Sequence, residues 1–216
     1  MIDLALSAVR TDSAIELLDA ELAAIAVLDT PQRIYQCPFR IIVDVNEGFP
    51  YRFSGLVTDK SEGERPIVVE TVARPLYQAF KKTVQVKGQW FNKGLADYTI
   101  EGMEEEVQVE RKSLEDLYGT LGGRRDDFEA EIARLNLCRF AAVVIEASWA
   151  EILFSPPSHS KLLPKTVSRT VQSWSIRYPA VHWFTCAGRQ HAEAFTFQVL
   201  NMFWRQRQHA RKEPAE

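Results

Sequence analysis

The chain has 216 residues, of which 46% are hydrophobic and 25% are charged. This composition is typical of a globular protein with one sizeable core and excludes disordered and fibrous classes. The formal net charge of −3 excludes a strongly basic nucleic-acid binder. The start of the chain has no basic segment followed by an apolar run, and no run approaches the roughly 18 apolar residues of a membrane span. We therefore expect an intracellular protein, cytoplasmic or nucleoid-associated in a prokaryote and nuclear in a eukaryote.

The first part of the chain contains a predicted helix and a predicted strand. Residues 13–28 have helical apolar spacing after a capping-box pattern, and residues 1–36 are interpreted as an N-terminal helical extension. Residues 39–45, FRIIVDV, form a β-branched run that predicts a buried strand with Asp44 near its carboxyl end. In the next segment, residues 51–57 and 66–72 are expected to be extended, and residues 59–66 between them an exposed turn. A short helix is expected at 76–84.

The second half predicts alternating strands and helices. Two extended segments, DYTIEG and EVQVERK, precede a helix that begins after Ser113 and stops at Gly122 and Gly123. The elements expected after them are a helix, a buried strand, a helix, a strand and a helix, at 125–136, 140–147, 165–177, 181–186 and 189–208. This order predicts an α/β fold with a mixed, mainly parallel sheet flanked by helices. We expect one domain over residues 37–208 and a flexible basic and polar tail at 209–216.

The segment VQVERK has a pattern suited to phosphodiester hydrolysis. Because side chains alternate along a strand, Glu110 and Lys112 lie on one face and Arg111 on the other. A carboxylate can ligate a divalent metal, while a lysine can position or activate water and offset phosphate charge. Asp97, on the preceding strand, is the natural second carboxylate. Taken alone the pattern is weak, because alternating charges on a solvent-exposed face produce it too.

The surrounding sequence resembles the nuclease domain of the XPF family of structure-specific endonucleases. The resemblance rests on LADYTIEG, then VERKSLEDLYGTLGGRRDDFEAEIARL, then FAAVVIEA. The core signature of that family is Gly-Asp followed by Glu-Arg-Lys-x-x-x-Asp. Its second part is matched in full by Glu110, Arg111, Lys112 and Asp116. The resemblance covers about residues 40 to 205, including IIVDVNE upstream and RYPAVHWFTCAGRQHAEAFTF downstream.

The resemblance implies a restriction-endonuclease-like core that uses Mg²⁺ or Mn²⁺. The implied substrate is branched, flapped or forked DNA, and the implied process is DNA repair or recombination. The metal ligands would be Asp97, Glu110 and Asp44, and Lys112 would be the catalytic lysine. The remaining implied site residues are Arg111 and Asp116 beside the reaction and Arg124, Arg125 and Arg111 on the DNA.

Two residues differ from the family pattern. Ala96 stands where the family has the Gly before its first Asp, and Asn46 stands where an Arg is usual, but neither change removes a metal ligand. No tandem helix-hairpin-helix module follows the core in this sequence.

The final predicted helix has two apolar stripes, formed by Phe195, Val199 and Met202 and by Phe197, Leu200 and Trp204. One stripe suffices to pack a helix on a sheet, so we expect a homodimer, or a heterodimer with a DNA-binding subunit.

Several alternatives remain open from the sequence. The chain could be a catalytically silent scaffold of the same fold that binds DNA or a nuclease partner, or an unrelated α/β protein with a chance motif. Asp44 could be a strand-end carboxylate that accepts backbone hydrogen bonds. Asp116 lies three residues after Ser113 and could belong to a helix cap. Arg111 could be an ion-pair partner, and Glu146 could be a structural residue.

Overall fold

The structure, a computed structural model, describes residues 34–76, 83–91 and 96–212. The chain divides into two compact units, one made of Met1–Tyr35 and Val57–Pro66 and the other of Gln36–Leu56 and Ile67–Glu216. The predicted helix at 13–28 lies outside the described residues, as do most of the predicted helix at 76–84 and the last four residues of the predicted tail. Within the described residues, no helix is both long and apolar enough to cross a membrane.

The described part of the first unit is a short loop closed by backbone hydrogen bonds. Thr58 N donates to Arg65 O at 2.9 Å, and Tyr35 N donates to Pro66 O at 2.8 Å. Between them lies the single-turn 3-10 helix η1, Lys60–Glu62, which ends at Gly63 with a φ of 90°. The segment expected to be an exposed turn at 59–66 is thus a turn, stabilised by its own backbone.

The second unit is built on a six-stranded sheet with the order β2-β1-β5-β6-β7-β8. Its strands are β1 Tyr35–Asp44, β2 Ile67–Arg74, β5 Tyr98–Ile100, β6 Val107–Lys112, β7 Phe140–Ile145 and β8 Val181–Thr185. The pairs β1-β5 and β5-β6 are antiparallel, whereas β6-β7 and β7-β8 are parallel. The predicted α/β class with a mixed sheet is confirmed, and an antiparallel meander continued by parallel strands agrees with the expected restriction-endonuclease-like core.

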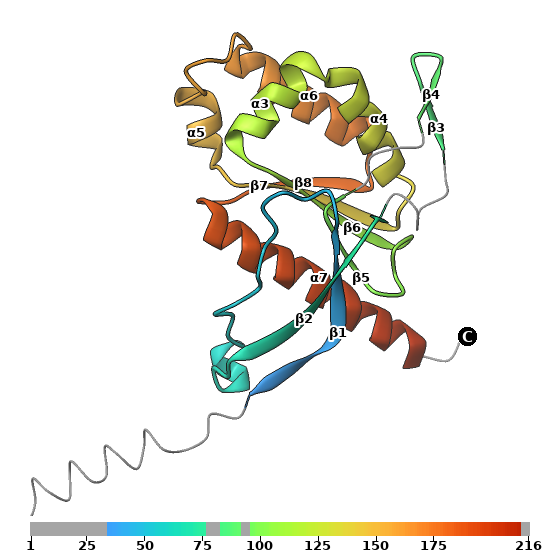
Figure 1. The fold of residues 1–216 in the computed structure, drawn as a ribbon, viewed down its shortest axis with the longest axis vertical. Helices are drawn as coiled ribbons and strands as arrows, with labels where there is room; N and C mark the ends of the chain where they lie inside the picture. The colour runs from blue at the N-terminus through green and yellow to red at the C-terminus, as the bar shows by residue number, and fades with distance from the viewer. Residues whose placement is uncertain (1–33, 77–82, 92–95, 213–216) are drawn as a thin grey trace, which may run out of the picture. The chain divides into compact units, whose positions relative to one another are not determined.

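Helices cover both faces of this sheet. One face carries the helices α3 Leu114–Gly123, α4 Arg125–Leu135, α5 Trp149–Phe154 and α6 Pro164–Arg177, which lie together in Figure 1. On the other face α7, Arg189–Lys212, crosses the strands, and the loop after β1 passes in front of it. Two apolar clusters fill the layers, with Trp174 and Phe128 in one and Phe39 and Leu200 in the other. Burial on both faces explains why β7 reads as an uninterrupted apolar run.

The two apolar stripes of α7 have different surroundings. Phe197 and Leu200 are buried in the core, and the Trp204 ring packs on Phe39 with centroids 5.8 Å apart. The other stripe, Phe195, Val199 and Met202, is half-buried to exposed, and Met202 is 64% exposed. Phe195 and Val199 also pack against the core, so Met202 is the exposed member of this second stripe. The helix also continues to Lys212, into residues predicted to be a tail.

A hairpin and a short helix were not predicted, and one prediction was wrong. The hairpin of β3 Val84–Val86 and β4 Gln89–Phe91 turns through Lys87 and Gly88, which both have positive φ, as a two-residue hairpin turn requires. The short helix α5 begins with a capping box between Ser148 and Glu151. Residues 51–57 do not form a strand, since they contain only an isolated bridge at Val57.

The strand register brings several strand ends to one edge of the sheet. Val43 pairs with Tyr98 at the end of β1 and the start of β5. Lys112 pairs with Ile145, and Ile145 pairs with Thr185, at the carboxyl ends of β6, β7 and β8. The residues that follow or precede these strand ends therefore share one edge, which in α/β sheets is the usual place for chemistry.

Candidate active site at the carboxyl edge of the sheet

Asp97 and Glu110 are brought together by the pairing of β5 with β6. Asp97 N donates to Val109 O at 3.1 Å, and Asp97 O accepts a bond of 2.8 Å from Asp44 N. The Asp97 carboxylate accepts a 2.7 Å hydrogen bond from Arg111 N. Two chain segments therefore fix Asp97 beside the end of β6, so the pair predicted from the sequence is adjacent in space.

Glu110 and Lys112 form a buried ion pair on the face of the sheet covered by α4. Lys112 Nζ donates to Glu110 Oε1, and the Glu110 and Lys112 side chains are only 4% and 14% exposed. The ammonium also lies 4.7 Å from the centre of the Phe128 ring. Glu110 Oε2 is buried, and a side-chain interaction with Glu131 of α4 raises the pKa of Glu131. The alternation of Glu110 and Lys112 onto one face, as predicted, thus places a buried ion pair beside a carboxyl group of α4.

The cluster is strongly acidic for a buried site. Burial, followed by the negative charges of Glu110 and Glu47, raises the pKa of Asp97 well above its ordinary value, and Lys112 offsets this only in part. Burial and the Glu110 carboxylate likewise raise the pKa of Glu131, a residue of α4. Burial alone would lower the pKa of Lys112, but the surrounding carboxylates raise it overall, which keeps the ammonium charged. One lysine thus sits among several mutually repelling carboxylates.

This repulsion predicts a pH-dependent stability for the metal-free protein. Because the pKa of Asp97 is higher folded than unfolded, folding is favoured below the unfolded pKa, and stability is lost as the pH rises through the folded pKa. Asp97→Asn removes the charge but keeps an oxygen that can accept from Arg111 N. In EDTA at about pH 8 we expect this variant to melt a few degrees above wild type, at about 2–4 °C for each kcal/mol regained.

The same comparison at about pH 4, near the ordinary pKa of an aspartate, is the internal control. There the wild-type carboxyl is itself protonated, so the two melting temperatures should converge. Differential scanning calorimetry across this range gives the result. A difference in melting temperature that is constant with pH would show that folding does not raise the pKa of Asp97.

The donor set fits a hard divalent cation. Carboxylate oxygens are the ligands that Mg²⁺ and Mn²⁺ prefer, and Asp97 and Glu110 provide them at one point of the sheet edge. The raised pKa values of Asp97 and Glu131 both indicate excess negative charge around Glu110, which a cation would relieve. Among the described residues, no three Asp, Glu, His or Cys side chains converge closely enough to hold an ion by themselves. Two protein ligands agree with the habit of Mg²⁺ of retaining several waters.

Comparisons with known proteins found similar solved structures, among them two of an archaeal XPF. One is XPF from Aeropyrum pernix, with a TM-score of 0.49 and 15% sequence identity over 80% of this chain and 69% of that chain. The other is XPF from Aeropyrum pernix in complex with DNA, with a TM-score of 0.48 and 15% identity over 82% of this chain and 68% of that chain. Both belong to the family that the sequence motif resembles. No family model and no curated protein matches the sequence.

On the opposite face of β6, Arg111 is the centre of a second, ion-paired group. Its guanidinium donates to both Glu146 oxygens, at 2.7 and 2.8 Å, and lies 3.4 Å from Glu47 Oε1. Arg189, the first residue of α7, donates to Glu146 at 3.1 Å. Burial alone would raise the pKa of Glu146, but Arg111 and Arg189 lower it, so the carboxylate stays ionised. The ion-pair interpretation of Arg111 describes what the structure shows.

Asp44 and Asp116 make local contacts. Asp44 Oδ1 accepts from Asn46 N and Nδ2 at 2.7 and 2.8 Å, and its Oδ2 accepts from Leu76 N at 2.7 Å. These bonds match the alternative of a strand-end carboxylate that accepts backbone hydrogen bonds. Asp116 lies in the first turn of α3, where Ser113 Oγ accepts from Asp116 N at 3.1 Å and donates to Asp116 Oδ2 at 2.9 Å. Asp116 therefore belongs to a helix cap, and its catalytic role stays a prediction.

The two arginines expected on DNA differ in their surroundings. Arg124 is exposed, and its positive charge partly opposes the rise in the pKa of Glu131 that burial and Glu110 cause. Arg125 NH1 donates to Thr170 Oγ1 at 2.7 Å, and its guanidinium lies 5.1 Å from the Trp174 ring, which ties α4 to α6. The expected phosphate contacts of both arginines stay predictions.

Three residues of the site were not singled out from the sequence. Glu131 is three residues after Phe128 and four before Leu135, so helical spacing alone places it on the buried face of α4. Glu47 follows the end of β1, and Arg189 begins α7. Glu47 is the last residue of the IIVDVNE segment that resembles the XPF family, but only the tertiary structure brings Glu47 and Arg189 to Arg111 and Glu146.

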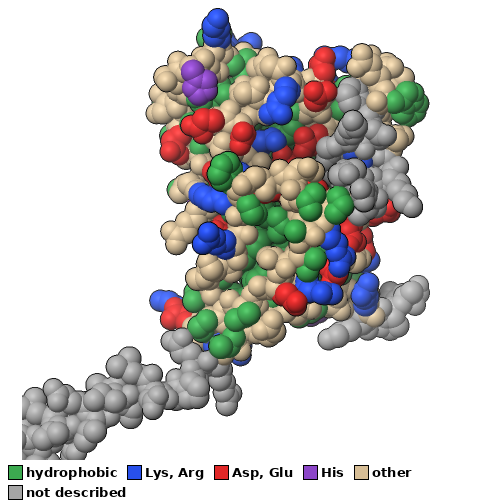
Figure 2. Space-filling model, in the orientation of Figure 1, with side chains coloured by type: hydrophobic (Ala, Val, Ile, Leu, Met, Phe, Trp, Pro, Cys, Tyr) green, Lys and Arg blue, Asp and Glu red, His purple; other side chains and the backbone are tan. Residues whose placement is uncertain are grey.

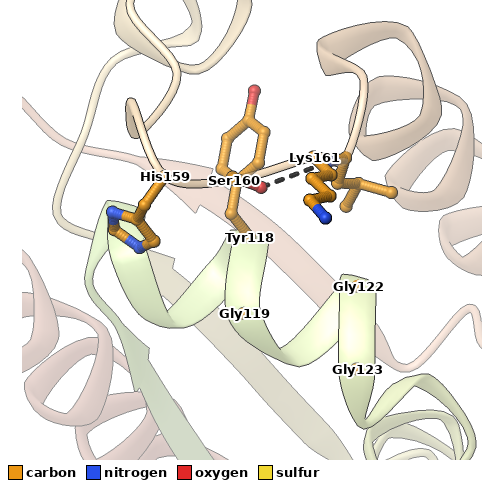
Figure 3. Close-up of a pocket in the computed structure, with 8 residues that line it drawn as sticks. Tyr118, Gly119, Gly122, Gly123, His159, Ser160 and Lys161 are labelled. Carbon is orange, nitrogen blue, oxygen red and sulfur yellow. Dashed lines mark hydrogen bonds between the residues drawn. The ribbon is translucent and has the colours of Figure 1, made fainter.

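A separate hollow of about 420 Å³ lies beside α3, away from these carboxylates. Figure 3 shows its lining, with Tyr118, Gly119, Gly122 and Gly123 on α3 and His159, Ser160 and Lys161 on the loop before α6. The glycines leave room there because they have no side chains, and the Tyr118 hydroxyl is used by a bond to Ile152 O. No carboxylate lines this hollow, so it offers no metal ligands of the kind found at the sheet edge.

Proposed function

We propose that this protein is a metal-dependent DNA endonuclease whose reaction takes place at Asp97, Glu110 and Lys112. The observation that carries the proposal is the buried Glu110, which pairs with Lys112 through one oxygen and lies beside Asp97, whose pKa is raised by burial and by the Glu110 charge. A purely structural ion pair has no need of a second buried carboxylate. A site for a cation and a phosphate needs all three groups.

Each residue has a role that follows from its surroundings. Asp97 and Glu110 would hold Mg²⁺ or Mn²⁺, which when bound makes water more acidic and offsets negative charge on a phosphate. Lys112, held as an ammonium by the carboxylates, would face the scissile phosphate and stabilise the charge that develops on it. The hydrogen bond from Arg111 N fixes Asp97, and Glu110 fixes Lys112. The chain thus supplies rigid positions and one cation.

The proposed substrate is DNA with a branch, flap or fork, in repair or recombination. On the face shown in Figure 2, acidic and basic side chains are interspersed and form no continuous basic band. With a net charge of −3, long-range attraction to the polyanion is weak. We therefore propose that affinity depends on local contacts beside the site and on a second subunit.

A substrate panel tests the activity. Pure protein is incubated with flap, fork, Holliday-junction and linear duplex DNA in the presence of Mg²⁺, Mn²⁺ or EDTA, and products are separated on denaturing gels. We expect cleavage of at least one branched substrate with either metal and none in EDTA. Absence of cleavage from every substrate, with DNA binding retained, would support the alternative of a catalytically silent scaffold.

We also propose that the exposed stripe of α7 pairs two nuclease chains. Phe195, Val199 and Met202 line an apolar groove of about 310 Å³, which Phe140 of β7 and Phe184 of β8 complete. The strand β8 is at the end of the sheet, and an edge strand beside an apolar groove is a ready surface for a second copy. A second copy of this chain, or a related DNA-binding subunit, would cover both.

A single charge tests this surface without disturbing the core. Met202→Glu places a carboxylate in the groove, and because Met202 is 64% exposed the monomer should stay folded. We expect sedimentation at micromolar concentration to show a wild-type dimer and a folded Met202→Glu monomer, with an unchanged far-UV spectrum. Ile176→Glu, at an 84% exposed position on α6, is the matched control and should stay dimeric. A monomeric wild type would exclude the homodimer.

A further inference from the structure

The loop after β1 and the start of α7 enclose a pocket that the reaction described above does not use. The pocket measures about 620 Å³ and is lined by Gly48, Phe49, Pro50, Arg52, Arg111 and Arg189. Three of these six residues are arginines, so the pocket is suited to an anion. The pocket lies on the face of β6 opposite to Glu110 and Lys112, and Arg111 connects the two sides, since its backbone N–H donates to Asp97.

Two of the three arginines are held in place by ion pairs, and the third has no acidic partner among the described residues. Arg111 and Arg189 share Glu146, and their guanidinium carbons lie 5.9 and 4.9 Å from the centre of the Tyr51 ring. Arg189 is still 41% exposed after these contacts. Arg52 is exposed, and no carboxylate among the described residues pairs with it. The pocket therefore contains two positioned cations and one that has no partner within the described structure.

Phe49 projects from the rim of the same pocket. Its side chain is 75% exposed, although its backbone is held firmly. Phe49 N donates to Glu47 Oε1 at 2.6 Å, while Phe49 O and Pro50 O accept from Arg189 NH2 at 2.7 and 3.0 Å. An aromatic ring presented to solvent by a rigid loop, beside cations, is the arrangement that binds a nucleotide by stacking on the base and pairing with the phosphate.

We propose that this pocket binds an unpaired DNA nucleotide at the same edge of the sheet as the scissile bond, with its phosphate on Arg52 and Arg189 and its base stacked on Phe49. The base must be unpaired because the faces of a base within a duplex are covered by its neighbours. The inference rests on the proposed nuclease function and deepens it, since a single-stranded arm beside the cut is what distinguishes a flap or fork from a linear duplex.

Binding measured without cleavage tests this proposal. Fluorescence anisotropy in EDTA compares a labelled single-stranded oligonucleotide with the blunt duplex of the same sequence. Phe49→Ala should weaken single-strand binding about ten-fold or more, the usual value of one base stacked on an aromatic ring, and leave duplex binding within about two-fold. Phe49→Trp should retain the affinity, because its ring can stack as well.

Matched variants separate stacking and charge from general surface effects. Phe154→Ala, at an 82% exposed position on α5, and Arg139→Gln, at an exposed position before β7, should both bind single strands like wild type. Arg52→Gln should weaken single-strand binding and reduce the slope of log affinity against log salt by about 0.7, the value for one lost phosphate contact. Because both side chains are exposed, the substitutions at Phe49 and Arg52 should leave the melting temperature of the protein unchanged.

Two results would overturn the proposal: single-strand affinity of Phe49→Ala equal to that of Phe154→Ala, or an equal loss of single-strand and duplex binding. Because these measurements are made in EDTA, they do not depend on catalysis. If no substrate is cleaved, the nuclease activity is refuted but the binding result is unaffected. If Phe49→Ala binds single strands normally, the pocket proposal is refuted but the nuclease activity is unaffected.

Discussion

Replacing either acidic residue, as Asp97→Asn or Glu110→Gln, is expected to reduce DNA cleavage in Mg²⁺ by a factor of about 10³ or more, because each change removes a ligand and a charge that acts on the reacting phosphate. Neither change alters the size of the side chain. DNA binding in EDTA should be retained or improved, because a negative charge near phosphate is removed. Both acidic side chains are held in the fold by hydrogen bonds that an amide oxygen can also accept.

The measurement is single-turnover cleavage of the best branched substrate, together with anisotropy on the same DNA. Glu115→Gln, at an exposed position on α3, is the control for loss of one acidic residue and should cleave like wild type. Parallel loss of binding and cleavage in both variants would argue that Asp97 and Glu110 serve the fold or the DNA contact instead of the reaction.

Lys112→Met is expected to slow the chemical step by about 10² or more and also to destabilise the protein. The rate falls because the positioned ammonium is lost. The stability falls because Glu110 stays buried without its partner, which typically costs about 3–5 kcal/mol. This is a large part of the roughly 5–15 kcal/mol that a domain of this kind has.

A double variant separates the two effects. Adding Glu110→Gln to Lys112→Met removes the unpaired charge, so urea denaturation should show that most of the lost stability returns while cleavage stays absent. Lys165→Met, at an exposed position on α6, is the control for loss of a lysine and should change neither quantity. Near wild-type turnover of folded Lys112→Met would remove the lysine from the mechanism.

The sequence by itself determined the elements whose signal is local. Helical spacing and caps gave the bounds of α4 and α6 to within one or two residues, and the apolar run gave β7. The strand period put Glu110 and Lys112 on one face, because side chains alternate whatever the strand pairs with. The capping alternative for Asp116 was also available locally, since Ser113 and Asp116 are only three residues apart.

Only the tertiary structure decided what depends on register and on neighbouring layers. The pairing of β5 with β6 sets Asp97 beside Glu110, and the packing of α4 on the sheet brings Glu131 to the same charges. Which stripe of α7 is buried more deeply could not be read from the helix, because both stripes are apolar in sequence and only their packing against the sheet distinguishes Leu200 from the exposed Met202. Arg52 and Arg189 are distant in sequence and meet in one pocket because β1 and α7 both border the carboxyl edge. Contacts between residues far apart in the chain follow from how the sheet is assembled, and local propensities do not encode that.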